Sequence, residues 1–230
     1  MATAAVDAIA PDIVTCLRIE PGGLDHYLAM VGEDGGNPLI KCLEGSLLLV
    51  SPRLSHERSG KNIDRLITAI CSVLGIRCIP CGSTLYRKAE ADTGVEPDES
   101  YFIQNSSKIR GRHDFDVLSA PCPDLVVEVA VTHDAAHSLA IYRVLGVPEV
   151  WIHDVPKGRL TFMRLKRSVG EEPKYVSTEK SLAFPFLATS DVLPWLQVED
   201  DGTYFRKASK WVRTVLKPRF AAANTKRRKT

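Results

Sequence analysis

One apolar segment with a single charge near its middle constrains the fold most strongly: Pro123-Asp-Leu-Val-Val-Glu-Val-Ala-Val131. Because side chains in a strand alternate between two faces, Glu128 shares a face with Val126 and Ala130. The other face is also apolar, so the strand is expected to be covered on both sides. An unpaired carboxylate is very costly in such a place. Glu128 therefore needs a metal ion, a proton or a cation as its partner.

Two further acids are candidates for the same site. Asp98 follows Pro97, which is tolerated at the start of a strand. Glu57 follows His56 near the start of a long predicted helix. Two or three carboxylates suffice for a hard cation such as Mg²⁺, which takes oxygen ligands and keeps several waters. The alternative for these acids is a buried ion pair or a protonated carboxyl, and for Glu57 also simple surface exposure.

The hydrophobic pattern predicts an α/β fold with a mixed central sheet flanked by helices. Apolar residues recur at helical spacing over 55–74 and 204–216, and a third helix is expected over about 134–145. A Glu44-Gly45 turn between two apolar runs predicts a hairpin over 38–51. We divide the chain into a loosely ordered segment at 1–22, a main α/β domain at 23–202 and a basic C-terminal helix and tail at 203–230.

The composition is typical of a soluble globular protein, with 230 residues, 44% of them hydrophobic and 25% charged. The sequence contains no apolar run long enough to cross a bilayer. The first ten residues lack the basic start and long apolar stretch of a signal peptide. We therefore expect a cytoplasmic protein with no membrane partner.

The charge is divided unevenly along the chain. Residues 203–230 hold ten of the 30 Lys and Arg residues and none of the 28 Asp and Glu residues. Such asymmetry suggests a polyanionic partner, although a basic end can also be a solvated surface helix. The residues expected to contact nucleic acid are Lys207, Lys210, Arg213, Lys217, Lys226, Arg227, Arg228 and Lys229.

The pair Cys78-Ile-Pro-Cys81 permits three interpretations. A zinc site would need a second Cys or His pair at finger spacing, which the sequence lacks. A redox pair would be expected to precede a helix, whereas a turn and a strand follow here. We favour buried, reduced thiols at a strand junction.

Six motifs in order resemble the Uma2 family of restriction endonucleases, a branch of the PD-(D/E)-x-K nuclease superfamily. Each is weak alone, but the six together over residues 24–196 are specific. They are Gly45-Ser-Leu-Leu-Leu-Val-Ser-Pro52, His56-Glu57, Gly82-Ser-Thr84, Gly94-Val-Glu-Pro-Asp-Glu-Ser-Tyr101, Pro123-Asp-Leu-Val-Val-Glu-Val129 and Ala140-Ile-Tyr-Arg-Val-Leu-Gly-Val-Pro-Glu-Val-Trp151.

The resemblance implies a restriction-endonuclease-like core that hydrolyses phosphodiester bonds. It assigns the metal to Asp98 and Glu128, with Glu57 assisting and Val129 offering its backbone carbonyl. The cofactor implied is Mg²⁺, with Mn²⁺ as the alternative. The partner implied is nucleic acid, with DNA expected ahead of RNA. A homodimer is a further expectation from the superfamily, because cutting both strands requires two sites.

The sequence departs from the superfamily at its lysine. The position two residues after Glu128 is Ala130, and the displaced position on the next helix, which the family usually fills with lysine, is Ser138. Losing one preorganised charge of this kind typically costs about 10²–10³ in rate. Two functions follow: a Mg²⁺-dependent endonuclease, or a catalytically weakened relative that binds nucleic acid or a protein.

Overall fold

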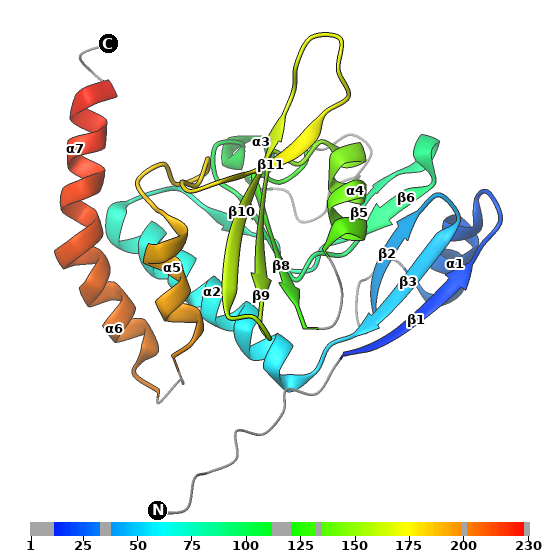
Figure 1. The fold of residues 1–230 in the computed structure, drawn as a ribbon, viewed down its shortest axis with the longest axis horizontal. Coiled ribbons are helices and arrows are strands. Elements are labelled where there is room, and N and C mark those ends of the chain that lie inside the picture. The colour runs from blue at the N-terminus through cyan, green and yellow to red at the C-terminus, as the bar shows by residue number, and fades with distance from the viewer. Residues whose placement is uncertain (1–11, 33–37, 112–120, 132–134, 199–201, 228–230) are drawn as a thin grey trace, which may run out of the picture.

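The structure is a computed structural model that describes residues 12–32, 38–111, 121–131, 135–198 and 202–227. Within these residues the strands form two sheets, one of six strands and one of five. Figure 1 shows the two sheets side by side, with long helices on the outer side of the larger one. The mixed α/β fold predicted from the sequence is confirmed, but its strands form two sheets instead of the single central sheet that was expected.

The six-stranded sheet is mixed and runs in the order β11-β10-β9-β8-β7-β4. The neighbours β8 and β9 are parallel, and the other pairs are antiparallel. A helix, α4 (Ala136–Leu145), makes the connection between the two parallel strands. The strands are β4 (Ile79–Pro80), β7 (Glu99–Phe102), β8 (Leu125–Ala130), β9 (Glu149–Asp154), β10 (Arg159–Lys166) and β11 (Lys174–Thr178).

The five-stranded sheet is antiparallel and runs in the order β1-β3-β2-β6-β5. Helix α1 (Gly23–Val31) packs on one of its faces through Leu24 and Leu28. Glu44 and Gly45 both have positive φ in the predicted hairpin turn, the conformation that a tight two-residue connection needs. The strands are β1 (Ile13–Arg18), β2 (Leu39–Leu43), β3 (Ser46–Ser51), β5 (Tyr86–Lys88) and β6 (Thr93–Val95), and the short helix η1 (Ala89–Ala91) lies between β5 and β6.

The strand β8 separates two apolar cores. Leu125 and Val127 belong to a core with α2, whereas Val126 belongs to a second core with α4. The alternation predicted for this strand is therefore confirmed, and Glu128 lies on the face of Val126. The helices of the first core are α2 (Leu54–Leu74), α5 (Thr189–Leu196), α6 (Tyr204–Trp211) and the π-helical segment η2 (Val212–Leu216), with α7 (Lys217–Arg227) beyond them. The short helix α3 (Ser106–Ile109) follows β7.

Both terminal segments are more closely joined to the rest of the fold than expected. The segment 1–22 was expected to be loosely ordered, but Ile13–Arg18 forms β1 and pairs along its whole length with β3. Residues 1–11 lie outside the described part. The basic C-terminal helix packs into the main core through the buried side chains of Tyr204, Val212 and Leu216. This helix therefore shares a hydrophobic core with α2 and the six-stranded sheet.

Candidate functional site

Asp98 and Glu128 face each other across two neighbouring strands. In the antiparallel pair β7–β8, Glu99 lies opposite Val127, which sets Asp98, one residue earlier, opposite Glu128. Side chains at directly opposed positions project from the same face, with Cβ atoms about 5 Å apart. The amide of Val129 donates a 2.6 Å hydrogen bond to Asp98 Oδ2, which fixes this carboxylate against β8. Both acid side chains are about 95% buried.

The second sheet supplies a cation to this pair. Lys41 of β2 makes an ion pair through Nζ with Glu128 Oε2, and it donates a 3.0 Å hydrogen bond to Ser138 Oγ. Ser138 in turn donates to Glu128 Oε2 at 3.3 Å. Burial lowers the pKa of Lys41, but the charges of Glu128 and Asp98 outweigh it and hold the pKa above its ordinary value. Lys41 is therefore an ammonium.

The other oxygen of Glu128 also has a partner. Tyr142 of α4, one turn after Ser138, donates a hydrogen bond to Glu128 Oε1. Burial raises the pKa of Glu128 above its ordinary value, although Lys41 opposes the shift. For Asp98 burial also favours the neutral acid, but the contact with His56 outweighs it and leaves the pKa below its usual range. The two carboxylates thus differ in acidity because they have different partners.

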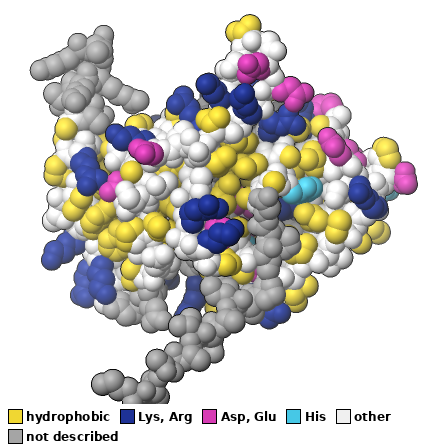
Figure 2. Space-filling model, in the orientation of Figure 1, with side chains coloured by type: hydrophobic (Ala, Val, Ile, Leu, Met, Phe, Trp, Pro, Cys, Tyr) yellow, Lys and Arg dark blue, Asp and Glu magenta, His cyan; other side chains and the backbone are white. Residues whose placement is uncertain are grey.

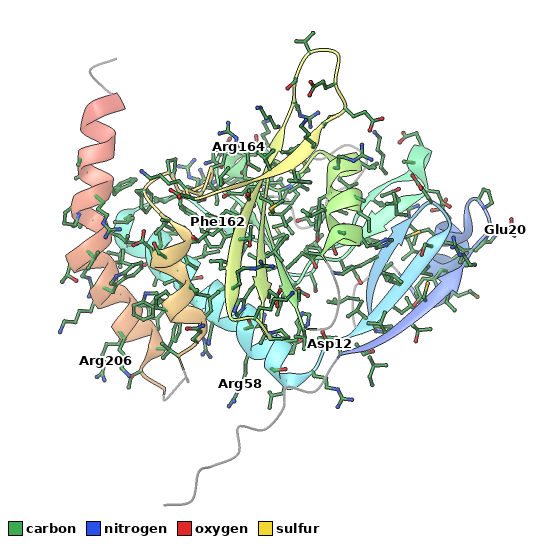
Figure 3. The ribbon with its side chains drawn as sticks, in the orientation of Figure 1. Asp12, Glu20, Arg58, Phe162, Arg164 and Arg206 are labelled. Carbon is green, nitrogen blue, oxygen red and sulfur yellow. The ribbon has the colours of Figure 1, made fainter. Side chains whose placement is uncertain are left out.

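His56 connects Asp98 to the start of the described chain. Its Nε2 lies 2.8 Å from Asp98 Oδ1, and its Nδ1 lies 2.8 Å from Asp12 Oδ2. Asp12 also accepts a 2.9 Å hydrogen bond from the amide of Arg53 at the N-terminal end of α2. Burial lowers the pKa of His56, but the two carboxylates outweigh it and raise the pKa to about 9. The ring is thus an imidazolium at neutral pH. Figure 3 labels Asp12 at the end of the molecule where α2 begins.

The predicted residue Glu57 is not brought to the acid pair. It is exposed, whereas its neighbour His56 is buried. Successive residues on a helix point about 100° apart, so the side chain that faces the sheets is that of His56. The assisting role of Glu57 and the ligand role of the Val129 carbonyl stay predictions. The contact that the structure records for Val129 is that of its amide with Asp98.

Ser138, the expected position of the displaced lysine, lies beside Glu128, whereas Lys41, His56 and Asp12 were not predicted as site residues. Lys41 had a usable signal: it is the one charge in the apolar run Leu39-Ile-Lys-Cys-Leu43, the same signal that singled out Glu128. Its partner, however, lies 87 residues away in the sequence. Pairing of this kind depends on how the two sheets approach each other.

The basic residues predicted to contact nucleic acid form an exposed stripe. Lys207, Lys210, Arg213 and Lys217 are exposed on α6, η2 and the start of α7. Figure 2 shows dark blue side chains along the left edge, where Figure 1 places these helices. The side chains of Lys226 and Arg227, and the whole of Arg228 and Lys229, lie outside the described part of the chain. The stripe and the acid pair lie on opposite faces of the six-stranded sheet.

The start of α6 nevertheless approaches the end of the molecule that holds the site. Tyr204 donates a 2.9 Å hydrogen bond to the backbone oxygen of Asn62 in α2. Asn62 lies six residues after His56, about 9 Å along the helix axis. Arg58, exposed on the intervening turn, projects outward from α2 (Figure 3).

The cysteines of this chain are not joined in disulfides. All six cysteines are free, and Cys81 follows directly on strand β4. No group of three or more His, Cys, Asp or Glu residues that could hold a metal ion is found in the described part of the chain. Its helices also include none long and apolar enough to cross a membrane.

Comparison with known proteins gives a family and a fold. The model of the Uma2 family, described as "putative restriction endonuclease", matches residues 24–199. A crystal structure described as that of "a putative nuclease belonging to DUF820" from Anabaena variabilis is 18% identical, with a TM-score of 0.50. That match covers 75% of this chain and 98% of the other. The curated proteins contain no significant match. Because the family model spans well over half of the sequence, this chain belongs to the Uma2 family.

Proposed function

We propose that this protein is a metal-dependent endonuclease that hydrolyses phosphodiester bonds in nucleic acid, with DNA as the expected substrate. The observation that carries the proposal is the proximity of two buried acids: Asp98, directly before β7, accepts a hydrogen bond from the Val129 amide of β8, next to Glu128. Membership of a family described as restriction endonucleases supports the same chemistry. Restriction-endonuclease-like nucleases generally use divalent metals, and Mg²⁺ or Mn²⁺ is the ion proposed.

The donor atoms of the site fit such an ion. Asp98 and Glu128 are the residues that would hold it, and carboxylate oxygens are the ligands that Mg²⁺ and Mn²⁺ prefer. A bound divalent ion would lower the pKa of a ligated water and neutralise charge on a phosphoryl oxygen. Two cationic side chains already contact these carboxylates, and a bound metal ion would have to coexist with them. Lys41 and His56 would share the carboxylates with the ion or move aside.

The chain's own groups would prepare the site for this reaction. Tyr142 and Ser138 hold the carboxylate of Glu128 from α4, and the amide of Val129 holds that of Asp98. His56 keeps Asp98 in its charged form. Groups already oriented by packing and hydrogen bonds lose little freedom when substrate binds.

A second candidate is a binding module without catalytic activity. The observation in its favour is that each oxygen of Asp98 and Glu128 already has a protein donor or cation beside it. In this alternative the four contacts are a structural ion-pair network, and the basic stripe alone engages nucleic acid.

Plasmid nicking separates these two functions. We expect the wild-type protein to nick supercoiled DNA in the presence of Mg²⁺ or Mn²⁺ and to lose this activity in excess EDTA. Asp98→Asn should lower the nicking rate by at least about 10²-fold, because it weakens the ligand set. Glu172→Gln is the matched control, since the side chain of Glu172 is 88% exposed and its ion-pair partner is Arg143 rather than a group of the acid pair. Equal rates for wild type and Asp98→Asn would favour the binding module.

The basic stripe is expected to contribute electrostatic, sequence-tolerant binding. Replacing Lys210, Arg213 and Lys217 together by Gln should weaken DNA binding and reduce the slope of log K against log salt by up to about three, roughly 0.9 per lost phosphate contact. Fluorescence anisotropy at several salt concentrations measures this slope. A triple variant with the same charge change on β10 and β11, at Arg164, Lys166 and Lys174, should leave the slope unchanged. Similar slopes for both triple variants would contradict a role for the stripe.

A further inference from the structure

Lys41 reaches the position from which the expected lysine is missing. The resemblance assigns that lysine to position 138 on α4, where this chain has serine. The Lys41 ammonium lies 3.0 Å from the Ser138 hydroxyl and forms an ion pair with Glu128. A lysine from the opposite sheet thus brings its charge to the place where the helix carries only a hydroxyl.

The alternation of side chains along β2 explains why Lys41 points toward Ser138. Side chains of β2 alternate, and Ile40 and Cys42 are buried against α1 on one face of the five-stranded sheet. Lys41 must therefore project from the other face, where α4 packs against β2. Leu48 and Val95 stand opposite Lys41 on the two neighbouring strands. The stem of Lys41 thus lies between apolar neighbours, and its side chain is 12% exposed.

A small cavity adjoins this ammonium and the carboxylates of Asp12 and Glu128. Its volume is about 40 Å³, and its lining includes Asp12, Lys41, His56, Glu128 and Ser138. A space of this size exceeds what one water molecule needs, and its polar lining offers hydrogen-bond partners. An ammonium on its wall can donate to a water or to a phosphoryl oxygen in the same space.

Resting on the proposed nuclease activity, we propose that Lys41 of β2 is the catalytic lysine of this chain, supplied across the two sheets in place of a lysine on α4. Its ammonium orients the attacking water and stabilises the negative charge that develops on the phosphoryl oxygens. Water supplies the oxygen that forms the new P–O bond and releases a proton to solvent. The P–O bond to the leaving 3′- or 5′-oxygen breaks, and that oxygen takes up a proton from solvent. Ser138 is a positioning residue, because it holds the Lys41 ammonium beside Glu128.

The test removes the ammonium from β2 and then places a new one on α4. Lys41→Met should lower metal-dependent nicking by about 10²–10³-fold. Adding Ser138→Lys to that variant places an ammonium on α4 and should recover at least about tenfold of the loss. The matched control is Lys61→Met, because Lys61 also pairs with a buried acid of β7, Glu99 at 2.7 Å, but is 60% exposed on α2. This control should nick at the wild-type rate.

A second readout distinguishes catalysis from a structural role. Binding of Mn²⁺, followed by titration calorimetry without DNA, should be as tight or tighter in Lys41→Met, since the ammonium no longer competes for Glu128. A merely structural lysine would lose Mn²⁺ binding and activity together, and it would not be rescued by Ser138→Lys. Wild-type rates in Lys41→Met, or a failed rescue in a double variant that binds Mn²⁺, would overturn the inference. A wild-type protein that binds Mn²⁺ yet does not nick would instead overturn the proposed function, and this inference with it.

Discussion

Replacing Glu128 by alanine is expected to abolish metal-dependent nicking and to lower the free energy of unfolding by about 3–5 kcal/mol. The structural reason is that the ammonium of Lys41 is left without its carboxylate in a site where Lys41 is 12% exposed. Tyr142 also loses the acceptor of its hydrogen bond. Urea unfolding followed by circular dichroism measures the stability, and a plasmid assay measures the nicking.

A double variant separates stability from chemistry. Lys41→Met with Glu128→Leu removes both charges and fills the site with apolar groups, which often restores the stability that a single replacement removes. We expect this variant to be at least about 2 kcal/mol more stable than Glu128→Ala and to stay inactive. Glu172→Ala, at an exposed position, should match the wild type in both assays. Wild-type stability of Glu128→Ala would mean that the buried ion pair with Lys41 does not form.

The second large effect is expected at Glu149, a buried acid on β9 that is not part of the Asp98–Glu128 pair. Its carboxylate accepts hydrogen bonds from the amides of Leu182 at 3.0 Å and Ala183 at 2.7 Å, and from the side chains of Trp151 at 3.0 Å and Ser181 at 3.1 Å. Glu149→Ala leaves these four donors without their acceptor. Each buried donor that stays unsatisfied lowers the free energy of unfolding by about 1–3 kcal/mol. Because the segment 181–183 can relax and satisfy some of these donors in other ways, we expect the free energy of unfolding to fall by about 3–5 kcal/mol, less than the sum of the four separate costs.

A second variant, Glu149→Gln, provides a comparison within the same unfolding experiment. Glu149→Gln keeps one acceptor oxygen but turns an amide group toward N–H donors, so its loss should lie between those of wild type and Glu149→Ala. Both variants should keep metal-dependent nicking at temperatures where they are folded, because Glu149 does not contact Asp98 or Glu128 among its recorded bonds. A loss below about 1 kcal/mol for Glu149→Ala would contradict this account of the 181–183 segment.

Local patterns in the sequence predict much of the larger sheet and its acid pair. The alternation in 125–130 predicts which face of β8 carries Glu128, and the proline before Asp98 predicts the start of β7. The helix expected over about 134–145, which carries Ser138 and Tyr142, is present as Ala136–Leu145 and ends at Gly146. Each of these features depends on residues close together in the chain, which is why local patterns reveal them.

The parts that could not be predicted depend on pairing between distant segments. Strand β1 has an exposed, irregular pattern and is held by its backbone pairing with β3. The five-stranded sheet forms from short strands spread over 13–95. Lys41 reaches Glu128 because that sheet packs against α4. The sequence therefore indicated an acid that needs a cation, but which cation it meets is decided by tertiary packing.

Diffraction from crystals soaked in Mn²⁺ tests the central claim most directly, because anomalous scattering locates the ion without assumptions about activity. We predict an anomalous peak between the carboxylates of Asp98 and Glu128, with the Lys41 ammonium still beside Ser138 or the cavity. Glu128→Gln crystals treated in the same way should lose the peak. The account is contradicted if Mn²⁺, at a concentration that supports nicking, binds elsewhere on the protein and leaves the two carboxylates paired only with Lys41 and His56.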